Sequence, residues 1–231
     1  MALPALPRID RLELAELALP DWHPRAADGS CVVLGYVVHH PDGPVVVDTG
    51  VGAGNELIER LYRPTVHDLV GRLAEVGVDE RDVVAVVCSH LHFDHCGQNA
   101  ALAAPVHVQA AERAAATEPG YTVPEWATLP DERWRVADGD VDLAQGLGVV
   151  ATPGHTPGHQ SVVVRGGDDV VLLGGQCAYT AAEFGAGTVD EGDVPDASWH
   201  PVAVESLRRL RSLHPTLALL AHDRAEWSPA R

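Results

Sequence analysis

The sequence contains no lysine, and all sixteen of its basic residues are arginine. Because 33 residues are Asp or Glu, the formal net charge at pH 7 is −17. Nucleic acids and anionic membranes bind proteins through basic surfaces, so this balance argues against both as partners. We interpret the acidic surplus as a solvated surface that indicates no particular partner.

Cysteine is also scarce, with four residues and no C-x-x-C pair. A chain of 231 residues is too long for a disulfide scaffold, so we expect buried free thiols. Cys96 and Cys177 are candidates to line the site described below.

No run reaches 18 apolar residues, so the sequence predicts no membrane-spanning helix. The N-terminus lacks the basic segment and apolar core of a signal peptide, so we expect a cytoplasmic protein.

The pattern of apolar runs predicts an α/β protein folded as a single domain over residues 1–231, with residues 1–30 as an N-terminal arm or strand. Residues 31–38 and 45–47 flank a Pro-Asp-Gly-Pro turn and predict a hairpin. Helical periodicity predicts a helix over residues 65–76.

The same patterns predict the remaining elements. Strands are expected at residues 83–87, 104–109, 160–165, 169–173 and 217–220, with two more within 136–150. Helices are expected at residues 55–61, 110–117 and 201–213. Residues 118–132 are expected to form either a lid or wall of a site or a plain surface connection, and residues 181–198 an acidic, Gly-rich loop.

One segment concentrates potential metal ligands. Residues 89–95 read S-H-L-H-F-D-H and directly follow a buried strand. Imidazole together with carboxylate suits zinc or iron. In an extended loop His90 and His92 point the same way and can bind one ion, while Asp94 and His95 can reach a second. The alternative, a His-rich surface loop, is disfavoured because other parts of the chain supply further ligands.

These further candidates lie far away in the sequence. Residues 152–159 repeat T-P-G-H, a rigid turn that fixes His155, and His222 follows the last strand. Asp48 ends a strand in D-T-G and is either a simple cap or an acceptor that holds a ligating imidazole in one tautomer. His107 lies within a strand, and we expect a core or surface histidine there.

Together these motifs resemble the metallo-β-lactamase superfamily over residues 31–224. Three segments resemble more closely the N-acyl homoserine lactone lactonases, which are quorum-quenching enzymes. They are residues 89–95, residues 152–161 (T-P-G-H-T-P-G-H-Q-S) and residues 178–180 (A-Y-T). The resemblance implies an αβ/βα four-layer sandwich with a metal site at the sheet edge.

The resemblance also implies two sets of metal ligands. One set is His90, His92 and His155, and the other is Asp94, His95 and His222. Zinc is the expected metal, with iron or manganese as alternatives.

Two further residues adjoin these sets. His159 is expected to support the ligands and not to bind an ion itself. Gln176 stands where the family has a bridging aspartate. A neutral amide oxygen offsets less of the repulsion between two dications than a carboxylate does, so we expect a firmly bound ion at the three-His set and a weaker second ion.

A bound dication lowers the pKa of its water, and the resulting hydroxide can attack an ester, lactone or thioester carbonyl. Asp94 is expected to pass a proton from the attacking water to the leaving alkoxide. The resemblance implies that Tyr179 donates a hydrogen bond to the carbonyl oxygen, although Tyr179 could instead be only a buried aromatic.

We therefore expect a metal-dependent lactone hydrolase that acts on a small molecule as a monomer or homodimer. One alternative is a tailoring hydrolase of another ester, thioester or amide in specialised metabolism. The other is a catalytically weak metal- or ligand-binding protein in which Gln176 has disabled the centre.

Overall fold

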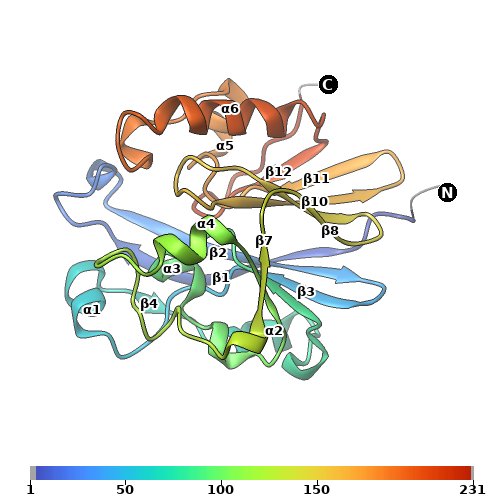
Figure 1. The fold of residues 1–231 in the computed structure, drawn as a ribbon, viewed down its shortest axis with the longest axis horizontal. Helices are drawn as coiled ribbons and strands as arrows, with labels where there is room; N and C mark the ends of the chain where they lie inside the picture. Colours follow the sequence, from blue (N-terminus) through green and yellow to red (C-terminus); the bar gives the residue numbers. More distant parts are fainter. Residues whose placement is uncertain (1–3, 230–231) are drawn as a thin grey trace.

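The computed structural model describes residues 4–229, which form two β-sheets packed face to face with helices on both outer sides (Figure 1). This confirms the expected four-layer αβ/βα sandwich. Helices α1 (Glu56–Tyr62) and α2 (Leu69–Glu75) lie outside the first sheet, and α5 (Ala181–Ala186) and α6 (His200–Arg211) lie outside the second. Among the described residues, no helix is long and apolar enough to cross a membrane.

The first sheet has the strand order β4-β1-β2-β3-β5-β6-β7. These strands are β1 (Ile9–Ala18), β2 (Ser30–His40), β3 (Gly43–Val47), β4 (Thr65–Val66), β5 (Ala85–Val87), β6 (Val106–Gln109) and β7 (Trp134–Ala137). Strands β3, β5, β6 and β7 run parallel. The carboxyl ends of β3 and β5 therefore meet at one edge, which brings Asp48 beside the loop of residues 89–95.

The second sheet has the order β12-β11-β10-β9-β8. Its strands are β8 (Val141–Ala144), β9 (Leu147–Ala151), β10 (Gln160–Gly166), β11 (Asp169–Leu173) and β12 (Leu217–Leu219). Strand β12 runs parallel to β11, so Gln176 after β11 and His222 after β12 leave the sheet at the same edge.

Strand β2 shows how the layers are built. Its side chains alternate, so that Val32 and Leu34 pack between the sheets, while Val33 and Val37 pack against the helices outside the first sheet. Both faces of β2 are buried, which explains its continuous β-branched run. The Tyr36 hydroxyl donates to the Leu220 carbonyl at 2.7 Å and ties the two sheets together.

The remaining helices are short. They are α3 (Phe93–Cys96), α4 (Ala110–Ala115) and the 3-10 helices η1 (Ala26–Asp28), η2 (Glu80–Asp82), η3 (Asn99–Ala101), η4 (Asp131–Arg133) and η5 (Glu191–Asp193).

Three expectations for secondary structure were wrong. The helix expected over 65–76 begins only at Leu69, because Thr65–Val66 pairs with β1 as an edge strand and Asp68 caps the helix by accepting from Gly71 N. The region 134–151 holds three strands, and the first of these belongs to the other sheet. The expected loop at 181–198 contains α5, which begins with a capping box between Thr180 and Glu183.

Candidate metal centre

Three loops meet at the shared edge of the two sheets. Residues 89–95 follow β5, residues 152–159 join β9 to β10, and His222 follows β12. A cleft of about 250 Å³ opens above them, and its lining includes His92 and Tyr179. The side chains expected from the sequence to bind metal are thus brought to one place.

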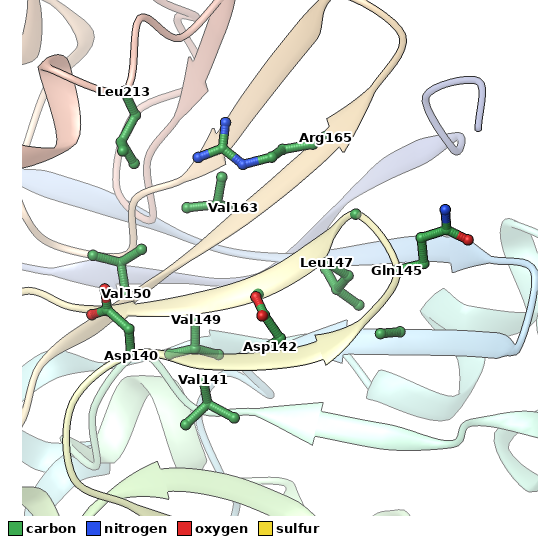
Figure 2. Close-up of a pocket in the computed structure, with 13 residues that line it drawn as sticks. Asp140, Val141, Asp142, Gln145, Leu147, Val149, Val150, Val163, Arg165 and Leu213 are labelled. Carbon is green, nitrogen blue, oxygen red and sulfur yellow. The ribbon is translucent and has the colours of Figure 1, made fainter. Parts of the chain in front are cut away.

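A larger groove of about 620 Å³ runs along β8 and β9 (Figure 2). Its lining includes Val141, Val149, Arg165 and Leu213, and it contains two aspartates but no histidine or cysteine. Because no set of potential catalytic groups converges there, we place the candidate site in the smaller cleft.

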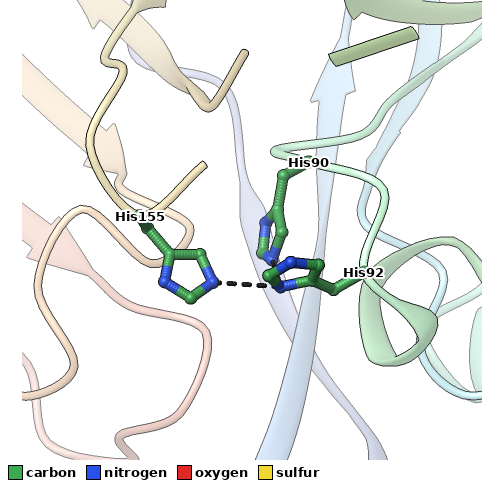
Figure 3. Close-up of side chains that lie close together, drawn as sticks. All are labelled: His90, His92 and His155. Atoms are coloured by element: carbon green, nitrogen blue, oxygen red, sulfur yellow. Dashed lines mark hydrogen bonds between the residues drawn. The ribbon is translucent and has the colours of Figure 1, made fainter. Parts of the chain in front are cut away.

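The first set of potential ligands consists of His90, His92 and His155, which point toward one another (Figure 3). His92 Nδ1 lies 3.1 Å from His90 Nε2 and 3.1 Å from His155 Nε2. Nitrogen atoms bound to one tetrahedral zinc at 2.0–2.1 Å lie ~3.3 Å apart. The spacing of these three nitrogens therefore fits a single ion.

The second set consists of Asp94, His95 and His222. Asp94 Oδ2 lies 3.6 Å from His95 Nε2 and 3.7 Å from His222 Nε2. Within residues 4–229, His95 Nε2 is the only buried side-chain nitrogen or oxygen without a hydrogen-bond partner. A buried polar atom without a partner is costly, so this nitrogen fits a group that the structure does not contain, such as a metal ion.

Four of the imidazoles are oriented by hydrogen bonds from their outer nitrogen atoms. Each donates from Nδ1: His90 to Ser89 Oγ (3.1 Å), His95 to Asp48 Oδ2 (2.9 Å), His155 to the Asp193 carbonyl (2.6 Å) and His222 to the Val32 carbonyl (2.9 Å). Each Nε2 is then left with its lone pair facing inward, which is the state that a metal ligand requires.

The pKa values of the three-His set and of Asp94 favour the same protonation states. Burial lowers the pKa of His92 to about 4, and burial together with neighbouring imidazoles holds the pKa values of His90 and His155 well below the usual range. Burial opposes ionisation of Asp94, but the facing imidazoles of His95 and His222 hold the pKa of its carboxyl group below its usual value. At neutral pH the three-His set therefore offers neutral imidazoles, and Asp94 offers an ionised carboxylate. Burial opposes ionisation of His95 and His222 as well, but the negative charge of Asp94 contributes to raising the pKa values of both above the usual range.

Asp48 acts as the acceptor that one interpretation of the sequence proposed. Its carboxylate accepts from Ser89 N at 2.6 Å, from Ser89 Oγ at 2.7 Å and from His95 Nδ1 at 2.9 Å. Its backbone is left-handed, with a φ of 59° that Asp tolerates better than most residues. Asp48 therefore fixes both the start of the 89–95 loop and the orientation of one ring.

The other candidate histidines lie outside both sets. Both ring nitrogens of His159 are engaged, Nδ1 with Thr152 and Nε2 as the acceptor for Gln176 N at 3.0 Å. His107 remains in β6.

The expectation that Cys96 or Cys177 lines the site was wrong. Cys31, and neither Cys96 nor Cys177, is among the residues that line the cleft. Burial raises the pKa values of Cys96 and Cys177 to about 12, so both stay protonated.

Residues 118–132, expected to form either a wall of the site or a surface connection, are not among the residues that line the cleft, and no motif in the sequence predicted its outer wall. This wall consists of Trp22, His23 and Pro24 from the segment before η1, with Tyr62 and Phe93 opposite. Trp22 is 62% exposed, and its ring lies 6.0 Å from that of Tyr62. A rim of aromatic and apolar side chains suits the apolar part of a small molecule.

Arg25 anchors this wall and was also missed. Its guanidinium group donates to both carboxylate oxygens of Asp193 and to Glu183 Oε1, and lies 4.0 Å above the Tyr179 ring. Glu183 in turn accepts from the backbone N of Tyr179, and the Asp193 carbonyl orients His155. Arg25 therefore connects the segment that carries the wall to two residues of the site.

Replacing Arg25 is expected to destabilise the fold. In Arg25→Met, Asp193 and Glu183 lose the cation that their largely buried carboxylates face, so we expect the free energy of unfolding to fall by about 3 kcal/mol. Denaturant titration measures the change. The matched control is Arg81→Met, which breaks an exposed ion pair and should leave the midpoint unchanged. Equal midpoints for both variants would contradict the anchoring role.

The comparisons with known proteins place this geometry in a family. The sequence profile of the metallo-beta-lactamase superfamily matches residues 28–222. The chain belongs to the metallo-beta-lactamase superfamily. A relative in this superfamily, an N-acyl homoserine lactonase of a Bacillus species, is 32% identical over 193 residues, which are 77% of this chain and 74% of the relative.

Solved structures of superfamily members agree. A quorum-quenching N-acyl homoserine lactone lactonase has a TM-score of 0.80 and 26% identity, with 96% of this chain and 94% of that chain covered. An N-acyl homoserine lactone hydrolase with N-hexanoyl-L-homoserine bound at its catalytic metal center has a TM-score of 0.73 and 26% identity, with 97% and 95% covered. The chain is thus a metal-dependent hydrolase of the metallo-beta-lactamase superfamily.

Gln176 lies beside the second ligand set. Gln176 Oε1 lies 3.1 Å from His222 Nε2. This is a hydrogen-bond distance, and it places the amide oxygen beside the ring nitrogen of His222 that faces Asp94. The amide can therefore contribute an oxygen to the second set, but without the negative charge of an aspartate.

Proposed function

We propose that this protein opens a small lactone of the N-acyl homoserine type. The observation that carries the proposal is the pair of adjacent three-ligand clusters at the base of a cleft that also contains Tyr179. Relatives that match most of the chain are lactonases, which supports the substrate class. We propose zinc for both clusters, His90, His92 and His155 as ligands of the first ion, and Asp94, His95, His222 and Gln176 as ligands of the second.

When bound, the ions supply a water molecule of lowered pKa and polarise the substrate carbonyl. Asp94 lines the cleft and faces His95 and His222, so its carboxylate is placed to accept a proton from the attacking water and return it to the leaving alkoxide. Tyr179 stacks on His222 with ring centroids 4.9 Å apart. Burial raises the pKa of its hydroxyl group far above neutrality, so the hydroxyl can donate a hydrogen bond to the carbonyl oxygen.

The direct test combines metal analysis with a substrate screen on one preparation. Protein purified without chelator is incubated with acyl homoserine lactones, other small lactones and thioesters, and the free acid is detected. We expect lactones to be hydrolysed, chelator to abolish the activity and zinc to restore it. Thioester hydrolysis without lactone hydrolysis would support the tailoring-hydrolase alternative and contradict our proposal.

Gln176→Asp tests the consequence of the missing negative charge. The wild-type protein is expected to retain about one tightly bound zinc after dialysis, whereas the variant should retain two, because an anionic ligand offsets the repulsion between the ions. Elemental analysis measures both values. Two firmly held ions in the wild type would contradict the unequal pair. A large rise in turnover of the variant would favour a disabled centre, and a fall would favour a specialised one.

A further inference from the structure

Glu112 is a fully buried carboxylate that the roles proposed above do not include. It lies in α4, outside the metal motifs, and is 0% exposed. Within residues 4–229, no arginine or histidine forms a salt bridge with it. A buried charge normally has a counter-charge or contributes to a metal site, so the position of Glu112 requires an explanation.

Its hydrogen bonds supply the first part of that explanation. Oε1 accepts from Leu91 N at 2.8 Å and from the Tyr121 hydroxyl. Oε2 accepts from Thr156 Oγ1 at 2.7 Å and from Gly158 N at 3.1 Å. Each oxygen thus receives one backbone N–H, which is fixed, and one hydroxyl, which can rotate.

The donors come from the segments that carry the three-His set. Leu91 lies between His90 and His92, and Thr156 directly follows His155. The Tyr121 ring lies 4.9 Å from that of His92. One carboxylate therefore connects both loops that provide the first ligand set.

The loop of residues 152–159 rests directly on α4. A Cβ atom added at Gly158 would lie 2.1 Å from Glu112 N, so only glycine allows this approach. The spacing between the two loops is therefore determined by close contact as well as by the hydrogen bonds of Glu112.

We propose that Glu112 is a positioning residue for the three-His metal site. Its carboxylate holds the two ligand loops in register, and the metal ion bound beside them supplies the positive charge that the buried carboxylate otherwise lacks. The inference rests on the proposed metal centre but not on the substrate.

Glu112→Gln tests this with a side chain of the same shape. The glutamine oxygen can accept from one pair of donors, but its NH₂ group must then face the other pair. A hydroxyl can turn to accept from that NH₂ group, whereas a backbone N–H cannot, so one loop loses its fixed hydrogen bond in either orientation. The negative charge is lost as well. Losing a group that supports metal ligands typically weakens metal binding 10- to 100-fold, and we expect about a 30-fold loss.

The measurement is the affinity for the first zinc equivalent, from competition with a chromophoric chelator, together with the visible spectrum of the cobalt-substituted protein. Glu118→Gln and Glu125→Gln are matched controls, because each makes the same change from carboxylate to amide at an exposed position. We expect them to change the affinity less than threefold. A purely structural role of Glu112 would lower the unfolding midpoint of the metal-free protein but leave the zinc affinity unchanged, and that result would overturn the proposal.

If Glu112→Gln does not fold, Glu112→Asp tests the same positioning role. It keeps the charge but is one methylene shorter, so it cannot reach both loops, and we expect at least tenfold weaker zinc binding. Wild-type affinity would overturn the proposal. The zinc-affinity measurement does not depend on lactone hydrolysis, so a protein without lactonase activity can still be tested in this way. Wild-type protein that binds no zinc would contradict the proposed metal centre itself.

Discussion

Asp94→Asn is expected to lower kcat by about 10³-fold, because the amide cannot accept the proton that passes between the attacking water and the leaving group. The amide is also neutral, so the second ligand set loses its one carboxylate. Steady-state hydrolysis of the best substrate from the screen, with the metal content measured on the same sample, gives the result.

The control for this prediction is Asp169→Asn, an exposed position on β11 that should retain full activity. Assay at saturating zinc separates the loss of proton transfer from the loss of the ion. A variant with two bound ions and a kcat within tenfold of the wild type would remove Asp94 from the proton-transfer role.

Tyr179→Phe is expected to lower kcat by about 10²-fold with little change in KM, because the lost hydrogen bond strengthens as negative charge develops on the carbonyl oxygen. The ring remains, so its stacking on His222 and its contact with Arg25 should persist. Tyr62→Phe, at the opposite wall of the same cleft, is the matched control and should be close to wild type. An unchanged kcat for Tyr179→Phe would reduce the residue to a packing role.

The ligand sets could be proposed from the sequence because each motif carries its own geometry. The spacing of His90 and His92 and the rigid turn around His155 can be recognised locally, and the structure brings them together. Their convergence with His222 could not be worked out from spacing and came from the family resemblance. Whether these side chains bind metal in this chain stays a prediction.

Arg25 and Glu112 could not be found in the same way. Glu112 lies in a short helix whose sequence shows no motif, and its partners are 9 to 46 residues away. Arg25 reaches Asp193 across 168 residues. Such residues act through tertiary contacts that only the folded chain creates. The start of α5 is different, because Thr180 and Glu183 have the spacing of a capping box and this local signal was overlooked.

The short edge strand β4 shows a second limit. Thr65 and Val66 fit the helical periodicity of the residues that follow, yet they pair with β1. The helix propensity of two residues contributes less free energy than the backbone hydrogen bonds that a neighbouring strand offers. The boundary of α2 was therefore decided by the sheet and not by the helix.

The hydrogen bond from His222 to the Val32 carbonyl joins residues 190 positions apart. The backbone of β2 thus orients the imidazole of His222, which completes the second ligand set. Assembly of that set requires the last strand to have docked beside the first sheet. The three-His set also joins both sheets, because His155 comes from the loop between β9 and β10 and is oriented by the Asp193 carbonyl, but its ligands do not include the last strand. Uptake of the second ion would therefore coincide with closure of the whole sandwich, which makes its occupancy a natural reporter of complete folding.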